Sequence, residues 1–390
     1  MTPRLSVALI VKNEEKLLAR SLASLKGRVD EIVCVDTGST DATVSIATEA
    51  GCRVVHWPWR EDFAAARNFA SSQCTGDWIL TWDADFVVAT PETTWRDIRA
   101  VMREPKVSCA SLWVHNAKSL KGNAARVAKG HGREGKPFAL ALLFRNVEPE
   151  RLYEGIIHEN PANWVLRRKA EGMHTVSLPG SNVVHYGYDP AHFRAADKGA
   201  RNMRLLTLAV EREPENPIPL SYLALIYAEH ETVAEGAEVT EANEYQRHLS
   251  MTPAESLQRA ADMLNTIWPM RARLEGVHLL RACVARCKVG FRMMGMGVEL
   301  EGGERGVDLM WDTTRVWDRE GPQEHPDMLL FKGLCCEMLA DMDTTESEAA
   351  AHRAAAKVFY TRSLEVPYGA MRFVTSETAE ERLQMMESAR

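Results

Sequence analysis

Residues 5–41, LSVALIVKNEEKLLARSLASLKGRVDEIVCVDTGSTD, contain the pattern that decides the fold of the first half of this chain. Two short β-branched runs, SVALIV and EIVCVD, enclose a segment whose apolar residues recur at helical spacing. The same alternation continues through CRVVHW and DWILTW up to about residue 90. Strands that alternate with helices in this way predict a parallel α/β sheet.

Polar residues follow three of these four predicted strands. They are residues 12–14 after the first strand, residues 36–41 after the second, and Asp83 and Asp85 after the fourth. Ligands of open α/β sheets bind at the carboxyl ends of the strands, so we expect the three clusters to share one edge. Ordinary solvated loops are the alternative explanation, because most βα turns are polar without binding a ligand.

The pattern changes twice further along the chain. From Ser108, longer β-like runs, SCASLWVHN and FALALLFRN, flank a loop from Ala117 to Lys136, and SNVVHYGY predicts one more strand. Beyond Pro190 the strand signal stops and apolar positions recur at three and four residues up to Arg390. We therefore predict an α/β domain over residues 1–190 and an all-helical domain over residues 191–390. The helices resemble a tetratricopeptide-like stack, although no clean 34-residue repeat is present and an irregular bundle is the alternative.

Composition narrows the class of protein. With 45% hydrophobic and 26% charged residues, the 390-residue chain is typical of a soluble globular protein. No run of about 18 apolar residues offers a membrane span, and the start, MTPRLSVALIVKNEE, is too polar for a signal peptide. The eight scattered cysteines are typical of reduced, buried thiols. We expect a cytoplasmic protein, and the net charge of −7 argues against a surface generally coated with nucleic acid.

Asp83 and Asp85 are candidate metal ligands. Residues at i and i+2 of an extended chain point to the same side, so both carboxylates would face one ligand. Mg²⁺ or Mn²⁺ bound through one or two carboxylates commonly bridges to a diphosphate. Such a cation would neutralise a departing nucleoside diphosphate as a sugar bond breaks. Two carboxylates at this spacing are common by chance, so the pair alone does not establish a metal site.

Asp36 is a candidate for binding a nucleotide base. It is the last residue of its predicted strand, where its carboxylate can accept a hydrogen bond from a base edge such as uracil N3. Gly38 permits a tight turn, and Asp41 is placed to cap the following helix. Capping alone is the alternative explanation for this loop.

Several motifs in the same order resemble the large family-2 glycosyltransferases with the GT-A fold. They are residues 5–51, EDFAAARNFA, GDWILTWDAD, LFRN, YEGIIHE and VVHYGY. The resemblance is strongest to the branch containing lipopolysaccharide-core glucosyltransferases and bacteriocin S-glycosyltransferases, and it extends to about residue 226. No single motif is specific, whereas the ordered set is. The resemblance implies a GT-A domain, a divalent metal, and an inverting transfer from a nucleotide-sugar donor, a UDP-sugar in the first instance.

The resemblance also implies roles for residues at matching positions. Asp83 and Asp85 would form the D-x-D motif, with Asp85 the more direct metal ligand and His185 a third ligand that suits Mn²⁺ better than Mg²⁺. A histidine satisfied by ordinary hydrogen bonds is the alternative for His185. Phe86 stands where many relatives carry another acidic residue, which leaves the metal site with less negative charge. The residues expected to line the nucleotide pocket are Asn13, Glu14, Asp36, Asp62, Arg67 and Asn68.

Glu159, in YEGIIHEN, is the candidate catalytic base. It lies between the D-x-D motif and His185, in the order where inverting members carry their catalytic carboxylate. As a general base it would deprotonate the acceptor as that group attacks the anomeric carbon. His158 could assist or compete for this role. The alternative is that Glu159 only positions the acceptor or pairs with an arginine.

The loop from Ala117 to Lys136 is strongly basic, with a local charge of about +5. One explanation is a solvated mobile loop. The other is that the loop folds over the diphosphate or guides an anionic acceptor, such as DNA, into the site. We predict a saccharide hydroxyl as the acceptor, with a hydroxymethylated DNA base or a peptide side chain as alternatives.

Two other classes of protein compete with the transferase. An inactive GT-A module that binds a glycan or partner is favoured only by Phe86. A nucleotidyltransferase usually has a glycine-rich basic loop after its first strand, and KNEEKL is not such a loop. We expect the helical domain to build part of the acceptor site or to form a homo-oligomer interface, because a helical stack presents an extended concave surface.

Overall fold

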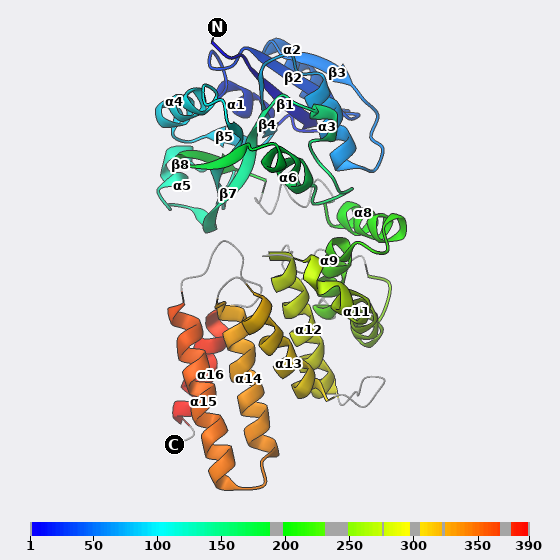
Figure 1. Ribbon diagram of the computed structural model, residues 1–390, viewed down its shortest axis with the longest axis vertical. Helices are drawn as coiled ribbons and strands as arrows, with labels where there is room; N and C mark the ends of the chain where they lie inside the picture. Colours follow the sequence, from blue (N-terminus) through cyan, green and yellow to red (C-terminus); the bar gives the residue numbers. More distant parts are fainter. Residues whose placement is uncertain are drawn as a thin grey trace. The chain divides into compact units, whose positions relative to one another are not determined.

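The computed structural model describes residues 2–187, 198–230, 249–274, 277–296, 305–321, 324–366 and 376–388. The chain divides into two compact units, Met1–Lys198 and Gly199–Arg390. The first unit is α/β and the described part of the second is helical (Figure 1). This confirms the predicted order of classes, an α/β domain followed by a domain whose described elements are all helices. The predicted boundary at residue 190 lies outside the described residues.

The first unit is built on one eight-stranded sheet with the strand order β3-β2-β1-β4-β7-β6-β8-β5. β1, β2, β3 and β4 pair in parallel, and β7 runs antiparallel to both β4 and β6. β8 is parallel to β6 and antiparallel to β5. The strands are β1 (Leu5–Val11), β2 (Glu31–Asp36), β3 (Arg53–His56), β4 (Trp78–Asp83), β5 (Phe86–Val88), β6 (Val107–Ala117), β7 (Arg133–Arg145) and β8 (His174–His185).

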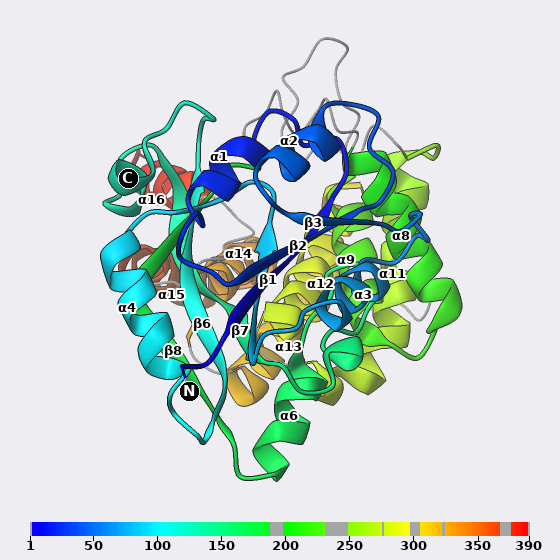
Figure 2. The ribbon, with the colours of Figure 1, turned by 90° about the horizontal axis from the view of Figure 1, so that it is seen from above.

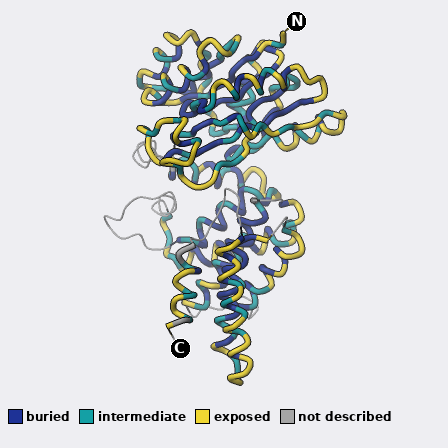
Figure 3. Tube along the Cα trace, turned by 90° about the vertical axis from the view of Figure 1, so that its left-hand side faces the viewer, coloured by how far each residue is buried: buried dark blue, intermediate teal, exposed yellow. Residues whose placement is uncertain are grey.

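The central strands are buried on both faces, as expected for parallel strands covered by helices. Along β1, Leu9 belongs to one hydrophobic core and Ala8 to the core on the opposite face. Figure 3 shows the buried residues of this unit in its interior, and the burial patterns of β1, β2 and β4 place these strands there. The register aligns Val11 with Asp36, and Ile10 with Asp83. The prediction that the polar clusters share one edge of the sheet is therefore confirmed.

Helices cover both faces of this sheet. Apolar residues of α1 and α4 complete one core, whereas α3 contributes to the other, and Figure 2 shows α3 and α4 on opposite sides of the strands. α3 begins at Asp62, whose side chain accepts a hydrogen bond from the backbone N of Ala65 (2.8 Å). The helices are α1 (Leu18–Ala23), α2 (Thr43–Glu49), α3 (Phe63–Ser72), α4 (Pro91–Val101), α5 (Ala124–Ala128) and α6 (Ala162–Ala170), with a 3-10 turn η1 (Pro149–Arg151).

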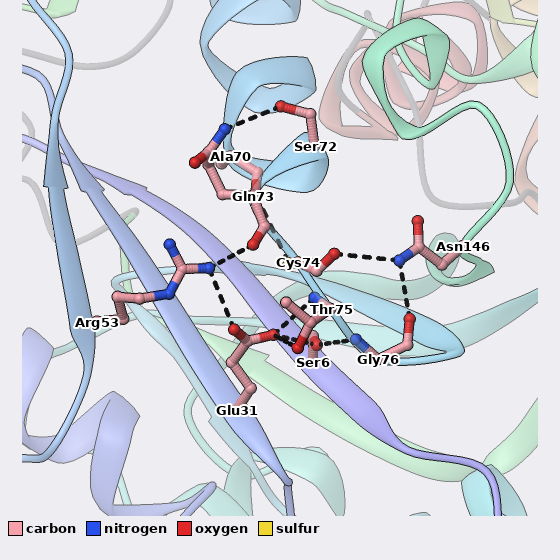
Figure 4. A network of polar contacts seen from close by, with 10 residues as sticks. All are labelled: Ser6, Glu31, Arg53, Ala70, Ser72, Gln73, Cys74, Thr75, Gly76 and Asn146. Carbon is pink, nitrogen blue, oxygen red and sulfur yellow. Dashed lines mark hydrogen bonds and ion pairs between the residues drawn. The ribbon is translucent and has the colours of Figure 1, made fainter.

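Glu31, at the start of β2, ties together the amino ends of the strands (Figure 4). Its Oε2 accepts hydrogen bonds from the Ser6 hydroxyl (2.6 Å) and the Thr75 backbone N (2.8 Å), and Oε1 pairs with Arg53 (3.1 Å). Burial acts to raise the pKa of Glu31, but these hydrogen bonds outweigh it and lower the pKa. This network stabilises the edge of the sheet opposite to the polar clusters.

In the second unit, helices that follow one another among the described residues pack against each other: α9 with α11, α12 with α13, and α14 with α15. α12 and α13 approach closely at two glycines, since a Cβ on Gly290 would lie 2.5 Å from the Gly306 carbonyl oxygen. This pairing is typical of tetratricopeptide-like helices. None of the helices in the described ranges is both long and apolar enough to span a bilayer. The elements are α8 (Lys198–Arg212), α9 (Pro217–Ala228), α11 (Pro253–Ile267), η3 (Trp268–Arg273), α12 (Val277–Met296), α13 (Gly306–Glu320), α14 (Pro326–Met342), α15 (Glu346–Glu365) and α16 (Ser376–Ser388).

Candidate functional site

The loop after β2 folds around the carboxylate of Asp36. Its Oδ1 accepts a hydrogen bond from the backbone N of Ser39 (3.0 Å), and its Oδ2 accepts one from Gly38 N (3.3 Å) and lies 3.2 Å from His56 Nδ1. Gly38 has a φ of 112°, which side chains other than glycine rarely allow. Burial acts to raise the pKa of Asp36, but the hydrogen bonds, those of Ser39 foremost, outweigh it and lower the pKa. The carboxylate is therefore ionised at neutral pH.

The turn after β1 holds this loop in place. Asn13 adopts a φ of 55°, a left-handed conformation that asparagine enters more readily than most residues. Its Oδ1 accepts a hydrogen bond from Thr40 N (2.8 Å), and its own N donates to Ser39 Oγ (3.0 Å). The backbone N of Glu14 donates to Thr43 Oγ1 (2.7 Å). Two of the residues expected in the nucleotide pocket thus lie against the Asp36 loop.

Residues of α3 fix the segment of residues 153–160. The backbone N of Phe63 donates to the carbonyl oxygen of Ile156 (2.9 Å). The Asn68 side chain both donates to the Tyr153 carbonyl (2.9 Å) and accepts from the Tyr153 backbone N (2.8 Å). Because one side chain satisfies both backbone groups of Tyr153, the start of the segment is held in one orientation.

Residues 153–160 form a closed loop that carries the candidate base. Glu154 and Asn160 exchange two backbone hydrogen bonds of 3.1 Å. Between them, Gly155 has a φ of 98° and His158 a φ of 55°. A left-handed conformation costs a residue with a side chain about 1–2 kcal/mol, and such strain is found most often at functional sites. The loop thus presents Glu159 directly after a strained residue.

Arg67 of α3 joins two of the predicted site carboxylates. Its Nε donates to Glu159 Oε1 (2.5 Å), and its Nη2 donates to Asp83 Oδ1 (2.8 Å). Burial acts to lower the pKa of Arg67, but the Asp83 and Glu159 carboxylates outweigh it and raise the pKa well above its ordinary value. The guanidinium is therefore a permanent cation between two acids. Pairing with an arginine, one of the alternatives considered for Glu159, is present in the structure.

Asp85 lies beside His185 at the end of β8, with Asp85 Oδ2 and His185 Nε2 3.1 Å apart. On the other side of the ring, His185 Nδ1 lies 3.1 Å from Asn116 Oδ1. Because the amide Oδ1 only accepts, Nδ1 carries the proton in this contact, and Nε2 faces the carboxylate either with a second proton that it donates or with a cation between the two atoms. Two acceptor atoms at this distance are stabilised when a proton or a cation lies between them. Histidine ligands of metals usually donate their second N–H to an oxygen in the same way.

Gly187 provides the space around this pair. A Cβ built on Gly187 would lie 2.4 Å from Asp85 Oδ2 and 2.6 Å from His185 Nε2. Adjacent ligands of a cation with bonds of about 2.1 Å are about 3 Å apart, close to the separation of these two atoms. Asp85, His185 and Gly187 therefore form a cradle that fits a divalent cation.

Asp83 does not join this pair in the structure. β4 ends at Asp83 and the chain turns before β5, so the alternation expected of an extended chain does not continue to Asp85. Asp83 bonds to Arg67 and Asp85 to His185. Within the described ranges, no group of three or more His, Cys, Asp or Glu side chains is placed to hold a metal ion.

Comparison with known proteins places the first unit in a family. Residues 6–172 match the model described as Glycosyl transferase family 2. The first unit of this chain belongs to glycosyl transferase family 2. A TPR repeat-containing protein of Synechococcus elongatus is 30% identical over 215 residues, which cover 55% of this chain and 49% of that protein. The glycosyltransferase SunS of Bacillus phage SPbeta is 26% identical over 226 residues, covering 55% and 47%.

The chain spans about half the length of these two curated relatives. Among solved structures, this chain is similar to a mannosyltransferase from Pyrobaculum calidifontis in complex with GDP-Man and Mn²⁺. The TM-score is 0.41 at 14% identity, and the match covers 93% of this chain and 88% of the mannosyltransferase chain. This chain is also similar to glucosyl-3-phosphoglycerate synthase from Mycobacterium tuberculosis in complex with Mn²⁺, UDP and phosphoglyceric acid, with a TM-score of 0.34, 16% identity and coverage of 52% and 78%.

Phe86 is part of the core of the family 2 domain. Its side chain is 2% exposed and packs edge-on against Trp82 and His185, with ring centroids 5.5 Å and 5.3 Å away. Position 86, where the resemblance places an acid, is thus occupied by a buried aromatic ring that packs against His185.

Three polar residues of EDFAAARN have partners within the family 2 domain itself. Asp62 caps α3, whereas Arg67 and Asn68 reach toward the loop of residues 153–160. Sequence reasoning placed all three in the nucleotide pocket, a role that stays a prediction. It missed Asn116 and Gly187. The run VVHYGY carried the signal for Gly187, because a glycine in a predicted strand often marks a site where a ligand or another backbone approaches closely.

Proposed function

We propose that this chain transfers a sugar from a nucleoside-diphosphate sugar to a hydroxyl of an acceptor, with inversion at the anomeric carbon. The observation that carries the proposal is the gathering of three features at one edge of a family 2 domain. They are the Asp36 loop, the Asp85–His185 pair, and the Arg67 bridge to Glu159. Ligands of α/β sheets bind at this edge, outside the carboxyl ends of the strands.

The Asp36 loop binds the nucleotide in this proposal. An ionised carboxylate at the end of β2 accepts a hydrogen bond from a base N–H, and N3–H of uracil is such a donor. The hydrogen bonds from Ser39 and Gly38 fix the direction in which the carboxylate points. Asn13 and Glu14 brace the loop from the neighbouring turn. A UDP-sugar is therefore the donor that we propose.

Asp85 and His185 would hold a divalent cation on the donor diphosphate. A mixed carboxylate and imidazole site suits Mn²⁺ better than Mg²⁺. When bound, the cation supplies positive charge to the leaving diphosphate. Asp83 is the further predicted ligand. To bind the cation, its carboxylate would have to leave its ion pair with Arg67. Phe86 excludes water from the face of His185 that it covers.

Glu159 acts as the general base in this proposal. The acceptor hydroxyl gives its proton to the Glu159 carboxylate while its oxygen forms a bond to the anomeric carbon. The bond between that carbon and the diphosphate oxygen breaks, and its electron pair leaves with the diphosphate. Arg67 and Asn68 are positioning residues, because they hold the Glu159 loop from α3. His158 is the alternative base, on the same strained turn.

The second candidate is a module that binds a glycan without turnover. The buried Phe86, in place of an acid, favours it, because the cradle then carries fewer carboxylates. The helical unit would contribute to acceptor binding or to a homo-oligomer interface under either proposal.

A donor panel tests the proposal. The full chain is incubated with UDP-, GDP- and dTDP-sugars in Mn²⁺, Mg²⁺ or EDTA, and nucleotide release is measured for the wild type, Asp85→Ala and a control. Asp312→Ala removes an exposed aspartate of α13 and is the control. We expect metal-dependent release from one donor that falls at least 100-fold in Asp85→Ala alone. Saturable glycan binding without release from any donor would establish the binding module instead.

A further inference from the structure

Residues 117–136 run from the end of β6 into the first residues of β7, and we call this segment the basic hairpin. It carries a net charge of +5, whereas the rest of the chain carries −12. Positive charge is therefore concentrated on one short segment of an acidic protein. Its charged residues are Lys118, Lys121, Arg126, Lys129, Arg133, Glu134 and Lys136.

The basic hairpin has an ordered structure in the described residues. α5 forms its far end, and Asn123 caps this helix by accepting a hydrogen bond from Arg126 N (3.2 Å). Val127 is buried in a small core that it shares with Tyr186 and Leu17. The hairpin thus packs on the body of the domain through Val127.

Arg20 of α1 clamps the near end of the basic hairpin. Its guanidinium donates to the carbonyl oxygens of Leu120 (2.8 Å) and Gly122 (2.7 Å) and lies 4.0 Å from the centre of the Tyr186 ring. The Tyr186 hydroxyl donates to the same Gly122 carbonyl (2.7 Å). Two side chains from separate elements therefore fix the turn at Leu120–Gly122.

The same elements connect the basic hairpin to the cradle. Asn116, the residue before the hairpin, accepts the hydrogen bond from His185 Nδ1 (3.1 Å). Tyr186, which holds the hairpin through its hydroxyl, donates its backbone N to the Asp85 carbonyl (3.0 Å). The position of the hairpin is therefore set relative to Asp85 and His185, where the sugar bond would break.

Several of its cations are available to a ligand. Lys121, Arg126 and Lys129 are exposed, and none of them forms an ion pair with a described acidic residue. Lys118 pairs with Glu134 at 3.6 Å in an exposed position, where an ion pair is weak. The field of such exposed charges extends about 8 Å at physiological ionic strength.

We propose, on the basis of the proposed function, that the basic hairpin binds the acceptor and that the acceptor is a small phosphorylated saccharide or polyol. A phosphate carries a charge of about −1.5 to −2 at neutral pH, and lysine and arginine are its usual partners. A small phosphate ester experiences the local charge of +5. A long polyanion such as DNA would also meet the remaining charge of −12, which opposes its approach.

Charge reversal tests this inference. The triple variant Lys121→Glu/Arg126→Glu/Lys129→Glu is compared with Lys26→Glu/Arg103→Glu/Lys106→Glu, which makes the same charge change in exposed residues that precede β2 and β6 at the opposite edge. A third variant, Lys121→Gln/Arg126→Gln/Lys129→Gln, removes the charges without reversing them. Melting curves verify that each variant folds, and binding of glucose 6-phosphate, glucose, inorganic phosphate and a 20-bp DNA duplex is measured by calorimetry.

We expect the wild type and the control to bind glucose 6-phosphate at least tenfold more tightly than both hairpin variants, and more tightly than glucose. Equal binding by the hairpin variants, or no binding of either phosphate probe by the wild type, would overturn the inference. Duplex DNA bound more tightly than glucose 6-phosphate, and lost in the hairpin variants, would assign the surface to nucleic acid instead. Nucleotide release by the wild type separates the two proposals. Release without any effect of the hairpin variants refutes the hairpin and leaves the transferase. Hairpin-dependent phosphate binding without release refutes the transferase and leaves the hairpin as a phosphate-binding surface.

Discussion

Gly187→Ala is the smallest change that tests the cradle, because it adds one methyl group beside both candidate ligands. The added Cβ would lie 2.4 Å from Asp85 Oδ2 and 2.6 Å from His185 Nε2. Real Cβ atoms are essentially never closer than 3.0 Å to such neighbours. The carboxylate oxygen must therefore move by at least 0.6 Å and the imidazole nitrogen by at least 0.4 Å, which are the differences between 3.0 Å and the two distances.

Ordinary van der Waals contact with a Cβ begins at 3.4 Å. Asp85 Oδ2, which would lie 2.4 Å from the added Cβ, must therefore move 1.0 Å to reach such a contact. A misplacement of about 1 Å in a catalytic constellation costs about 100-fold in rate. Overpacking by one methyl group costs about 1–3 kcal/mol of stability, which most domains tolerate. We therefore expect Gly187→Ala to fold and to lose about 100-fold in kcat.

The assay is steady-state nucleotide release from the donor that the wild type accepts, at saturating Mn²⁺, with a melting curve for each variant. Gly295→Ala is the matched control, because a Cβ there meets nothing within 4 Å and the residue lies in α12. Alanine is the better helix former by about 1 kcal/mol, so this control should keep its activity and melt no lower than the wild type. A folded Gly187→Ala variant with a kcat within twofold of the wild type would refute the cradle.

Three further changes test other parts of the account. Arg67→Met leaves Glu159 without its buried cation and should lower kcat at least 100-fold. Arg67→Lys should give an intermediate kcat, because it keeps the charge but not the bridge made by two nitrogens. Equal kcat values for the Arg67→Lys and Arg67→Met variants would contradict the bridge. Asp36→Asn should weaken UDP binding at least tenfold by calorimetry and leave the melting temperature within a few degrees; unchanged UDP affinity would exclude Asp36 from the nucleotide site. Glu31→Gln should lower the free energy of unfolding by about 1.5–3 kcal/mol at pH 7, measured by urea titration. Because the pKa of Glu31 is lowered in the folded state, its contribution to stability is present above the unfolded pKa and is lost as the pH falls through the folded value. The difference in unfolding free energy between the wild type and Glu31→Gln should therefore narrow as the pH falls below 4.5. A difference that widens in acid would contradict the network.

Local pattern was enough to predict the parallel strands and the edge at which the polar residues of the candidate site lie. β1, β2 and β4 are short buried runs whose ends coincide with the first polar residues, so Asp36 and Asp83 could be placed at strand ends from sequence. The resemblance then predicted that Asp85 and His185 belong to one site, and they lie 3.1 Å apart in the structure.

The partners of the site residues could not be predicted in the same way. Whether Asp83 faces Asp85 or Arg67 depends on where β4 ends, and strand ends are set by pairing with other strands. The contact between Arg67 and Glu159 joins residues 92 positions apart, beyond the reach of any periodicity. The clamp of Arg20 on the basic hairpin is equally remote in sequence, and only the folded chain brings these groups together.

The most direct test of the central claim is calorimetric titration of UDP into the full chain with Mn²⁺ and with EDTA, for the wild type and His185→Ala. We predict that the wild type binds UDP at least tenfold more tightly with Mn²⁺ than with EDTA, and that His185→Ala binds it with the EDTA-like affinity under both conditions. UDP affinity that is the same with Mn²⁺ and EDTA, or a Mn²⁺ effect that survives in His185→Ala, would contradict the account of a metal-assisted donor site at this edge of the sheet.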